Sequence, residues 1–167
     1  LCRQGHAMTA EHFTFMQGFL KERSGLVLGN DKGYLLESRL TPIARRHDIK
    51  DLDELVAKAM SAPTEALLVD ITEAMTTNES FFFRDQKPFD LFENHVLPHL
   101  LEHRAFTKAF RIWSAAASSG QESYSLAMIL KEQAAKIPGW RTEIFGTDLS
   151  SEIIRKAENG LYTQFEG

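Results

Sequence analysis

Residues 110–122 read Phe-Arg-Ile-Trp-Ser-Ala-Ala-Ala-Ser-Ser-Gly-Gln-Glu, and three local patterns follow one another in this stretch. The alternating, β-prone segment 110–115 predicts a strand. Small residues continue to Gly120 and predict a tight loop, after which residues 122–135 carry apolar side chains at helical spacing. A strand, a loop and a helix in this order are typical of the start of a parallel, doubly wound sheet.

The pattern begins again downstream. Residues 142–147 predict a second strand, which ends at Asp148. Ser150 or Ser151 can cap the helix that follows, and Gly160 can end it. The C-terminal part of the chain is therefore expected to be the beginning of a Rossmann-like α/β domain.

The loop after the first strand is a candidate ligand site, because ligands of such sheets bind beyond the carboxyl ends of the strands. A single glycine, Gly120, does not make the G-x-G-x-x-G fingerprint, so a pyrophosphate cradle is poorly supported. Asp148 could accept hydrogen bonds from the ribose of an adenosine moiety. The alternatives without a ligand are that the loop is only a tight turn and that Asp148 only caps a helix. Together, the loop and Asp148 favour a ligand such as S-adenosylmethionine (SAM).

Before residue 76 the apolar residues recur at helical spacing in four segments. The first two predicted helices cover residues 11–20 and about 31–46, the third opens at Asp51, and the fourth starts at Pro63 or Thr64. A fifth helix, residues 86–103, is expected to kink or restart at its internal proline. The predicted inward residues of the second helix are Tyr34, Leu35, Leu40, Ile43 and Ala44.

We predict from these patterns an α + α/β fold. Residues 8–76 would form an all-α helical subdomain, and residues 77–167 would form a linker and a partial α/β domain.

The segment 76–84, Thr-Thr-Asn-Glu-Ser-Phe-Phe-Phe-Arg, interrupts the helical rhythm and is predicted to be a buried linker. Its aromatic residues could line a pocket in which Asn78, Ser80 and Arg84 are the polar groups. The planar guanidinium of Arg84 suits a carboxylate. The alternative, which these residues alone favour, is that the phenylalanines belong to the core and Arg84 caps a helix end.

Two further clusters of charged or titratable residues give weaker indications of a functional site. Arg39, Arg45 and Arg46 could steer an acidic protein partner, but an ordinary solvated helix face explains them equally well. Three histidines are spaced by four residues, as metal ligands on one helix face can be. A proline interrupts this helix, however, and no further ligand completes a metal site. We therefore predict a solvated face and no metal site for the three histidines, His95, His99 and His103.

Composition restricts the class of protein. The chain has 167 residues, 43% of them hydrophobic, and a net charge of −4, which disfavours nucleic-acid binding. The apolar runs are too short for a membrane span, and we expect no signal peptide. The single cysteine, Cys2, fits a reducing compartment, so a cytoplasmic location is predicted. Met8 is expected to be the natural start.

Three motifs in order resemble the CheR family of chemoreceptor glutamate methyltransferases. The segment 76–84 resembles the family's Thr-Asn-x-Ser/Thr-x-Phe-Phe-Arg motif. Residues 111–125 resemble its first SAM motif, with Ser123 in place of a common proline, and residues 145–150 resemble its ribose-binding strand end. The likeness extends over about residues 13–167. It implies a helical subdomain followed by the start of a Rossmann-like SAM-dependent methyltransferase domain.

The resemblance also implies roles for individual residues. Asn78, Ser80 and Arg84 would approach the methionine end of SAM, and Arg84 would in addition orient the methyl acceptor as the catalytic residue. The receptor-facing helix would carry the cluster described above, Arg39 and Arg45 with Arg46 beside them. The remaining cofactor contacts would come from Ala116, Glu122 and Asp148.

The implied reaction is methyl transfer from SAM to a glutamate of a chemoreceptor's cytoplasmic helical bundle, with S-adenosylhomocysteine as the product. Family members continue beyond the region that matches Gly167, so the chain is expected to be a partial domain. In one interpretation, this partial domain is inactive on its own. Two copies would then exchange elements in a domain-swapped dimer. The alternative is a non-catalytic module that docks on receptors or on a regulatory protein.

Overall fold

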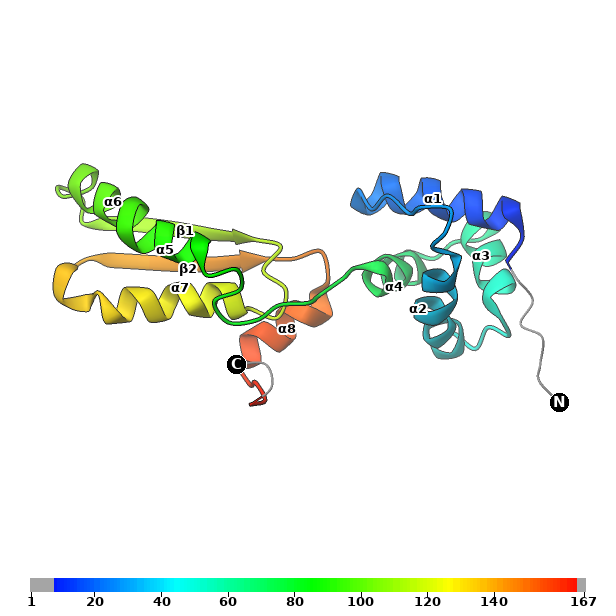
Figure 1. The fold of residues 1–167 in the computed structure, drawn as a ribbon. Helices are drawn as coiled ribbons and strands as arrows, with labels where there is room; N and C mark the ends of the chain where they lie inside the picture. Colours follow the sequence, from blue (N-terminus) through cyan, green and yellow to red (C-terminus); the bar gives the residue numbers. More distant parts are fainter. Residues whose placement is uncertain (1–7, 165–167) are drawn as a thin grey trace. The chain divides into compact units, whose positions relative to one another are not determined.

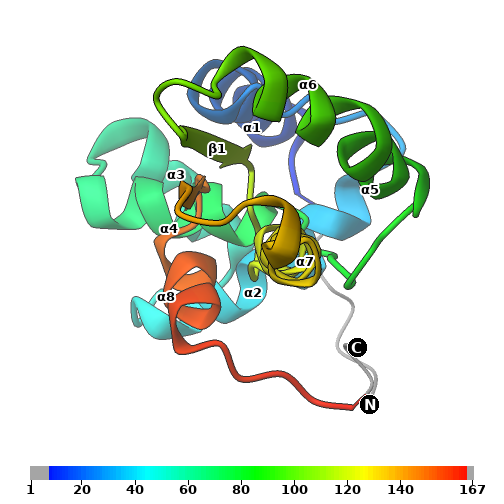
Figure 2. The same ribbon diagram turned by 90° about the vertical axis from the view of Figure 1, so that its left-hand side faces the viewer.

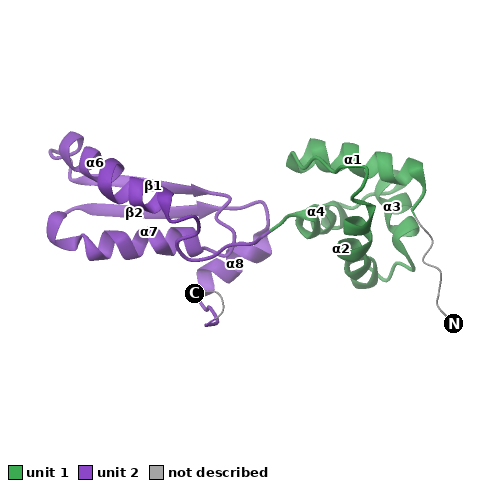
Figure 3. Cartoon of the chain, in the orientation of Figure 1, with its two compact units in different colours: residues 1–77 green, residues 78–167 purple. Residues whose placement is uncertain are grey.

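The computed structural model describes residues 8–164, which fall into two compact units on either side of the junction between Thr77 and Asn78 (Figure 3). Cys2 lies outside the described residues. Each unit has a hydrophobic core formed from its own residues.

Among the described residues of the first unit, 8–77, the regular elements are all helices (Figure 1). Thr9, Asp51 and Thr64 each accept a hydrogen bond from a backbone N–H of the first helical turn, as expected of residues that cap helix starts. Gly25, with a φ of 74°, ends the first helix. The helices are α1 (Ala10–Ser24), α2 (Gly33–Arg46), α3 (Leu52–Ser61) and α4 (Glu65–Met75).

The buried face of α2 differs from the one predicted from the sequence. Tyr34 was predicted to be buried but is 61% exposed, and Leu36 is fully buried instead. The two positions are two residues apart, which places them on nearly opposite sides of a helix. Every member of the buried stripe follows the three- and four-residue spacing that starts at Leu36, and the stripe comprises Leu36, Leu40, Ile43 and Ala44.

The second unit begins with the linker and continues with a helical segment against a two-stranded sheet. Its helical segment contains α5 (Lys87–Leu91), a π-helical turn (Phe92–Val96) and α6 (Leu97–His103). The irregular turn therefore lies just before Pro98, which itself sits in the first turn of α6, where a proline is tolerated. The remaining elements are β1 (Ala109–Ala115), α7 (Gln121–Glu132), a 3-10 turn (Ala134–Lys136), β2 (Arg141–Thr147) and α8 (Ser151–Asn159).

The strands β1 and β2 pair in parallel, in a register that joins Ala109 to Arg141 and Ala115 to Thr147. Figure 2 looks along the strands and shows α6 and α7 on the same side of the sheet. Buried side chains from these helices and from β1 form the core on that side, namely Leu97, Phe110 and Leu130. Because the side chains of a strand alternate, the residues between the core positions form the opposite face.

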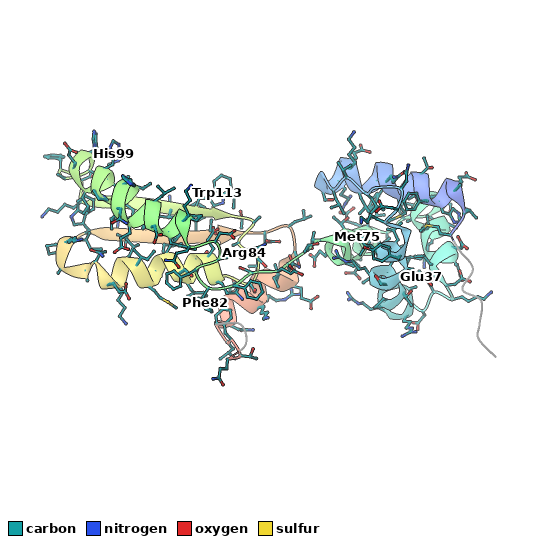
Figure 4. All side chains as sticks on the ribbon, in the orientation of Figure 1. Glu37, Met75, Phe82, Arg84, His99 and Trp113 are labelled. Carbon is teal, nitrogen blue, oxygen red and sulfur yellow. The ribbon has the colours of Figure 1, made fainter. Side chains whose placement is uncertain are left out.

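The linker is less buried than predicted. Phe81 is 52% exposed and Arg84 is also exposed. Phe82 is half-buried and packs edge-on against Tyr162, with ring centroids 5.0 Å apart (Figure 4). Three successive aromatic side chains cannot all point the same way, so only some of them can be covered by one neighbouring surface.

Candidate functional site

The loops that follow β1 and β2 are joined by hydrogen bonds at the carboxyl ends of the two strands. The N–H of Ala117 donates to the carbonyl of Thr147 at 2.9 Å. The carboxylate of Asp148 accepts from the N–H of Ser118 at 2.9 Å and from the N–H of Ser150 at 3.0 Å. Asp148 therefore connects both loops, in addition to standing where a ribose ligand was predicted.

The loop between β1 and α7, residues 116–120, is called the β1 loop here. It follows a tight path that depends on left-handed backbone conformations. Ala116, Ser118 and Gly120 have φ values of 58°, 51° and 95°. A Cβ atom on Gly146 would lie only 2.7 Å from the Cβ of Ala117. Glycine at position 146 therefore lets the β1 loop lie directly against β2.

A cavity of about 300 Å³ lies between the linker, the β1 loop and the start of α7. Four of the six predicted cofactor residues line it: Ser80, Arg84, Ala116 and Glu122. Its apolar wall includes Phe81, Phe89 and Leu126, among other residues.

The charged groups of this cavity are available to a ligand. Arg84 donates from one guanidinium nitrogen to the carbonyl of Glu79 at 2.8 Å and is otherwise exposed (Figure 4). A guanidinium has five N–H donors in a fixed fork, so this bond leaves several of them free. The carboxylate of Glu122 accepts from the hydroxyl of Ser114 at 2.7 Å, which orients it at the first turn of α7. The lining of the cavity thus includes one cation, Arg84, and three acidic residues, Glu79, Asp85 and Glu122.

Asn78 and Asp148, the other two predicted cofactor residues, do not line this cavity. They are connected to it through Ser118, which does. The hydroxyl of Ser118 donates to the carbonyl of Asn78 at 3.0 Å, and its N–H donates to Asp148. Ser118 was not predicted from the sequence, and its position inside a small-residue loop was the only signal that could have pointed to it.

The three predicted receptor-binding arginines face different neighbours. Arg39 donates to the carbonyls of Met75 and Thr76, at 2.9 and 3.1 Å. Its guanidinium therefore caps the C-terminal end of α4. Arg46 forms an ion pair with Asp70 of α4 at 3.3 Å. Arg45 instead lines a cavity of about 950 Å³ bordered by α1, α2 and the start of α3. The three guanidinium groups therefore have different neighbours in the fold.

The predicted solvated histidines lie on exposed positions. His95 belongs to the π-helical turn, which breaks the four-residue spacing. His99 and His103 stack with ring centroids 3.9 Å apart, and the Nδ1 atom of His103 lies 3.0 Å from the carbonyl oxygen of His99. Figure 4 labels His99, far from the cavity around Arg84. Within residues 8–164, no three His, Cys, Asp or Glu side chains are placed to hold a metal ion.

Comparison with known families decides the assignment. Residues 11–76 match the family model described as "CheR methyltransferase, all-alpha domain", and residues 78–166 match the one described as "CheR methyltransferase, SAM binding domain". The chain belongs to the CheR methyltransferase family. The second match indicates SAM as the methyl donor of this CheR domain.

Named relatives agree with the CheR assignment. The chain is 39% identical over 153 residues to "Chemotaxis protein methyltransferase 1" of Pseudomonas aeruginosa, which covers 90% of this chain and 55% of the relative. It is 37% identical over 146 residues to "Chemotaxis protein methyltransferase 1" of Vibrio cholerae, covering 86% and 52%. With the Escherichia coli "Chemotaxis protein methyltransferase" it shares 31% identity over 164 residues, covering 96% and 53%. The CheR chain thus spans about half the length of these relatives.

The helices of the CheR chain give no sign of a membrane span. Over residues 8–164, none is both long enough and apolar enough to cross a bilayer.

Proposed function

We propose that this chain contributes the helical domain and part of the SAM site of a methyltransferase that methylates glutamate side chains of chemoreceptors. The observation that supports this most is the cavity in which Arg84 and Glu122 face the β1 loop, with Asp148 tied to the same loop by a hydrogen bond. It lies at the carboxyl ends of two parallel strands, where ligands of such sheets bind.

The residues around the loop fit the chemistry of SAM. A carboxylate has about four acceptor positions, so Asp148 can accept two ribose hydroxyls beside its two backbone N–H donors. The free N–H groups of Arg84 suit the carboxylate of the methionine end, and Glu122 suits its ammonium group. Asn78, Ser80 and Ala116 would complete the cofactor contacts. When bound, SAM supplies an electrophilic methyl group on a sulfonium.

The proposed acceptor needs no general base from the protein. A glutamate side chain is ionised at neutral pH and already nucleophilic. The task left to the protein is to hold the acceptor carboxylate in position, and we assign this task to Arg84 as the catalytic residue. Its exposed guanidinium could hold one carboxylate oxygen while the other attacks.

The proposed partner is the acidic helical bundle of a chemoreceptor, reached in the cytoplasm. Of the three arginines of α2, Arg45 is the one whose guanidinium makes no hydrogen bond or ion pair with another residue of the described chain. Arg39 and Arg46 would act mainly by holding α2 against α4. We therefore expect receptor affinity to depend more on Arg45 than on Arg46.

Calorimetry with S-adenosylhomocysteine tests the cofactor site. We expect micromolar binding by the unmodified chain and a loss of about tenfold or more in Asp148→Ala, since a charge-assisted hydrogen bond contributes about 1.5–3 kcal/mol. Lys32→Ala is the matched control, because Lys32 belongs to the first unit and forms its ion pair with the neighbouring Asp31 at 2.9 Å. Absence of binding, with receptor affinity retained and dependent on Arg45, would favour the docking module instead.

Turnover on isolated receptor tests the role of Arg84 in the protein that contains this chain. Arg84→Ala should lower the rate of methyl transfer by about a hundredfold, and Lys32→Ala should leave it unchanged. Equal rates for Arg84→Ala and the unmodified protein would remove Arg84 from the mechanism. S-adenosylhomocysteine affinity measured on the same variant separates loss of cofactor binding from loss of acceptor positioning.

A further inference from the structure

Another cavity of the second unit lies at the opposite end of the two strands from the candidate SAM site. It measures about 500 Å³ and is lined by residues of α6, the turn before β1, the first three residues of β1 and the first residue of β2. A seven-residue strand is about 20 Å long, so this cavity is well separated from the β1 loop. Its lining includes the three arginines Arg104, Arg111 and Arg141.

Two of the three arginines carry uncompensated charge. Arg111 forms an ion pair with Glu143 at 2.8 Å and lies over the ring of Phe145. In contrast, the guanidinium groups of Arg104 and Arg141 make no hydrogen bond or ion pair with any residue of the described chain. The mouth of the cavity therefore carries about two positive charges that no carboxylate of this part of the protein neutralises.

The backbone around these arginines is held in place. The carbonyl of Arg104 accepts from the hydroxyl of Thr107 at 3.2 Å and from the N–H of Lys108 at 2.8 Å. The carbonyl of Lys108 in turn accepts from the N–H of Arg141 at 2.9 Å, and Lys108 has a left-handed φ of 46°. The turn that carries Arg104 is thus bonded to the strand that carries Arg141, so a ligand need not order it.

We propose that this basic cavity binds the phosphate groups of a phosphorylated small molecule. Guanidinium groups, here those of Arg104 and Arg141, recognise phosphate oxygens through paired N–H donors. Leu100 and Phe110 supply an apolar wall for the rest of the ligand. The volume lies within the range of small-molecule sites, and a concave site of this size suits a compact dianion better than an extended acidic peptide.

Calorimetry with inorganic pyrophosphate, in a phosphate-free buffer at 0.15 M salt, tests the proposal. We expect one binding site, and affinity about tenfold weaker in each of Arg104→Ala and Arg141→Ala, since each removes a charge-assisted contact. Arg104→Lys, which keeps the charge but loses the planar fork, should fall between Arg104→Ala and the unmodified chain. Saturating S-adenosylhomocysteine should leave pyrophosphate binding unchanged, which separates this site from the proposed SAM site.

Arg155→Ala is the matched control, because Arg155 is an exposed arginine on α8 of the same unit. Circular dichroism of every variant checks that the fold is retained. The proposal is wrong if pyrophosphate does not bind the unmodified chain, or if Arg155→Ala weakens binding as much as Arg104→Ala. It is also wrong if a hexaglutamate peptide binds this surface more tightly than pyrophosphate, which would make it a docking surface for acidic protein segments.

Discussion

At Gly146 the strand β2 passes so close to the β1 loop that a side chain has no room. The nearest atom to an added Cβ is the Cβ of Ala117, which the backbone fixes in place and which therefore cannot rotate away. The same loop donates from Ser118 to Asp148. A displacement of the loop would therefore disturb the proposed ribose contact as well as the packing.

We predict that Gly146→Ala lowers the free energy of unfolding by about 1–3 kcal/mol, because overpacking a tight contact forces the backbone to shift. Urea denaturation measures this change. The double variant Gly146→Ala with Ala117→Gly should regain part of the loss, because it removes the opposing methyl group. If Gly146→Ala is as stable as the unmodified chain, the loop does not lie against β2 as the structure has it.

At the scale of single elements, α7 contains two serines whose hydroxyl oxygens are buried in contrasting environments. The hydroxyl of Ser123 is buried and has no hydrogen-bond partner in the described chain. The fully buried Ser125 accepts from the N–H of Phe83 at 2.9 Å and donates to the carbonyl of Gln121 at 2.7 Å. Ser125 therefore holds the linker against α7, and Ser123 contributes no such bond.

The two serines give opposite predictions for stability. Ser123→Ala should raise the free energy of unfolding by about 1 kcal/mol, because it removes an unpaired buried hydroxyl and alanine favours a helix. Ser125→Ala should lower it by about 1–3 kcal/mol, because the N–H of Phe83 loses its acceptor. Each variant is the other's control in urea denaturation. A fall in stability for both would show that Ser123 has a partner.

At the scale of the whole molecule, each unit encloses its own hydrophobic core. The core of the first unit draws all its buried residues from the helices and turns between Met16 and Met75. The core of the second unit is smaller, and its sheet has one face with exposed aromatic side chains: Trp113 is 63% exposed and stacks on Phe145, which is 43% exposed (Figure 4). The first unit therefore has the better prospect of folding alone.

We predict that residues 8–77, produced as a separate chain, fold into a helical domain with a single cooperative unfolding transition. About 70 residues can sustain a core when the packing is this regular. Leu36→Ala in that chain should lower the free energy of unfolding by about 2–5 kcal/mol, since Leu36 is fully buried. Exposed Tyr34→Ala is the control and should change it little. Circular dichroism during thermal and urea unfolding measures both, and an unfolded spectrum of the separate chain would contradict the prediction.

The sequence alone predicted the order and type of the elements, because helix caps, apolar spacing and strand alternation are local signals. Asp51, Ser150 and Gly160 act at helix ends as their local sequence indicated. The parallel pairing of β1 and β2 also followed from the strand–loop–helix–strand order. The likeness to the CheR family, carried by short motifs, was confirmed by the family match.

Only the tertiary structure decided which side chains meet. It showed that Ser118 joins Asn78 to Asp148, and that Arg39 closes the end of α4. These contacts join residues that lie 30 to 40 positions apart in the chain. Hydrogen bonds of that range depend on how the elements pack, and local spacing carries no information about packing. Ser80 and Arg84 line the cavity, as their motif suggested. The three arginines of α2 differ from them, because their neighbours depend on how the helices pack and only the fold could reveal them.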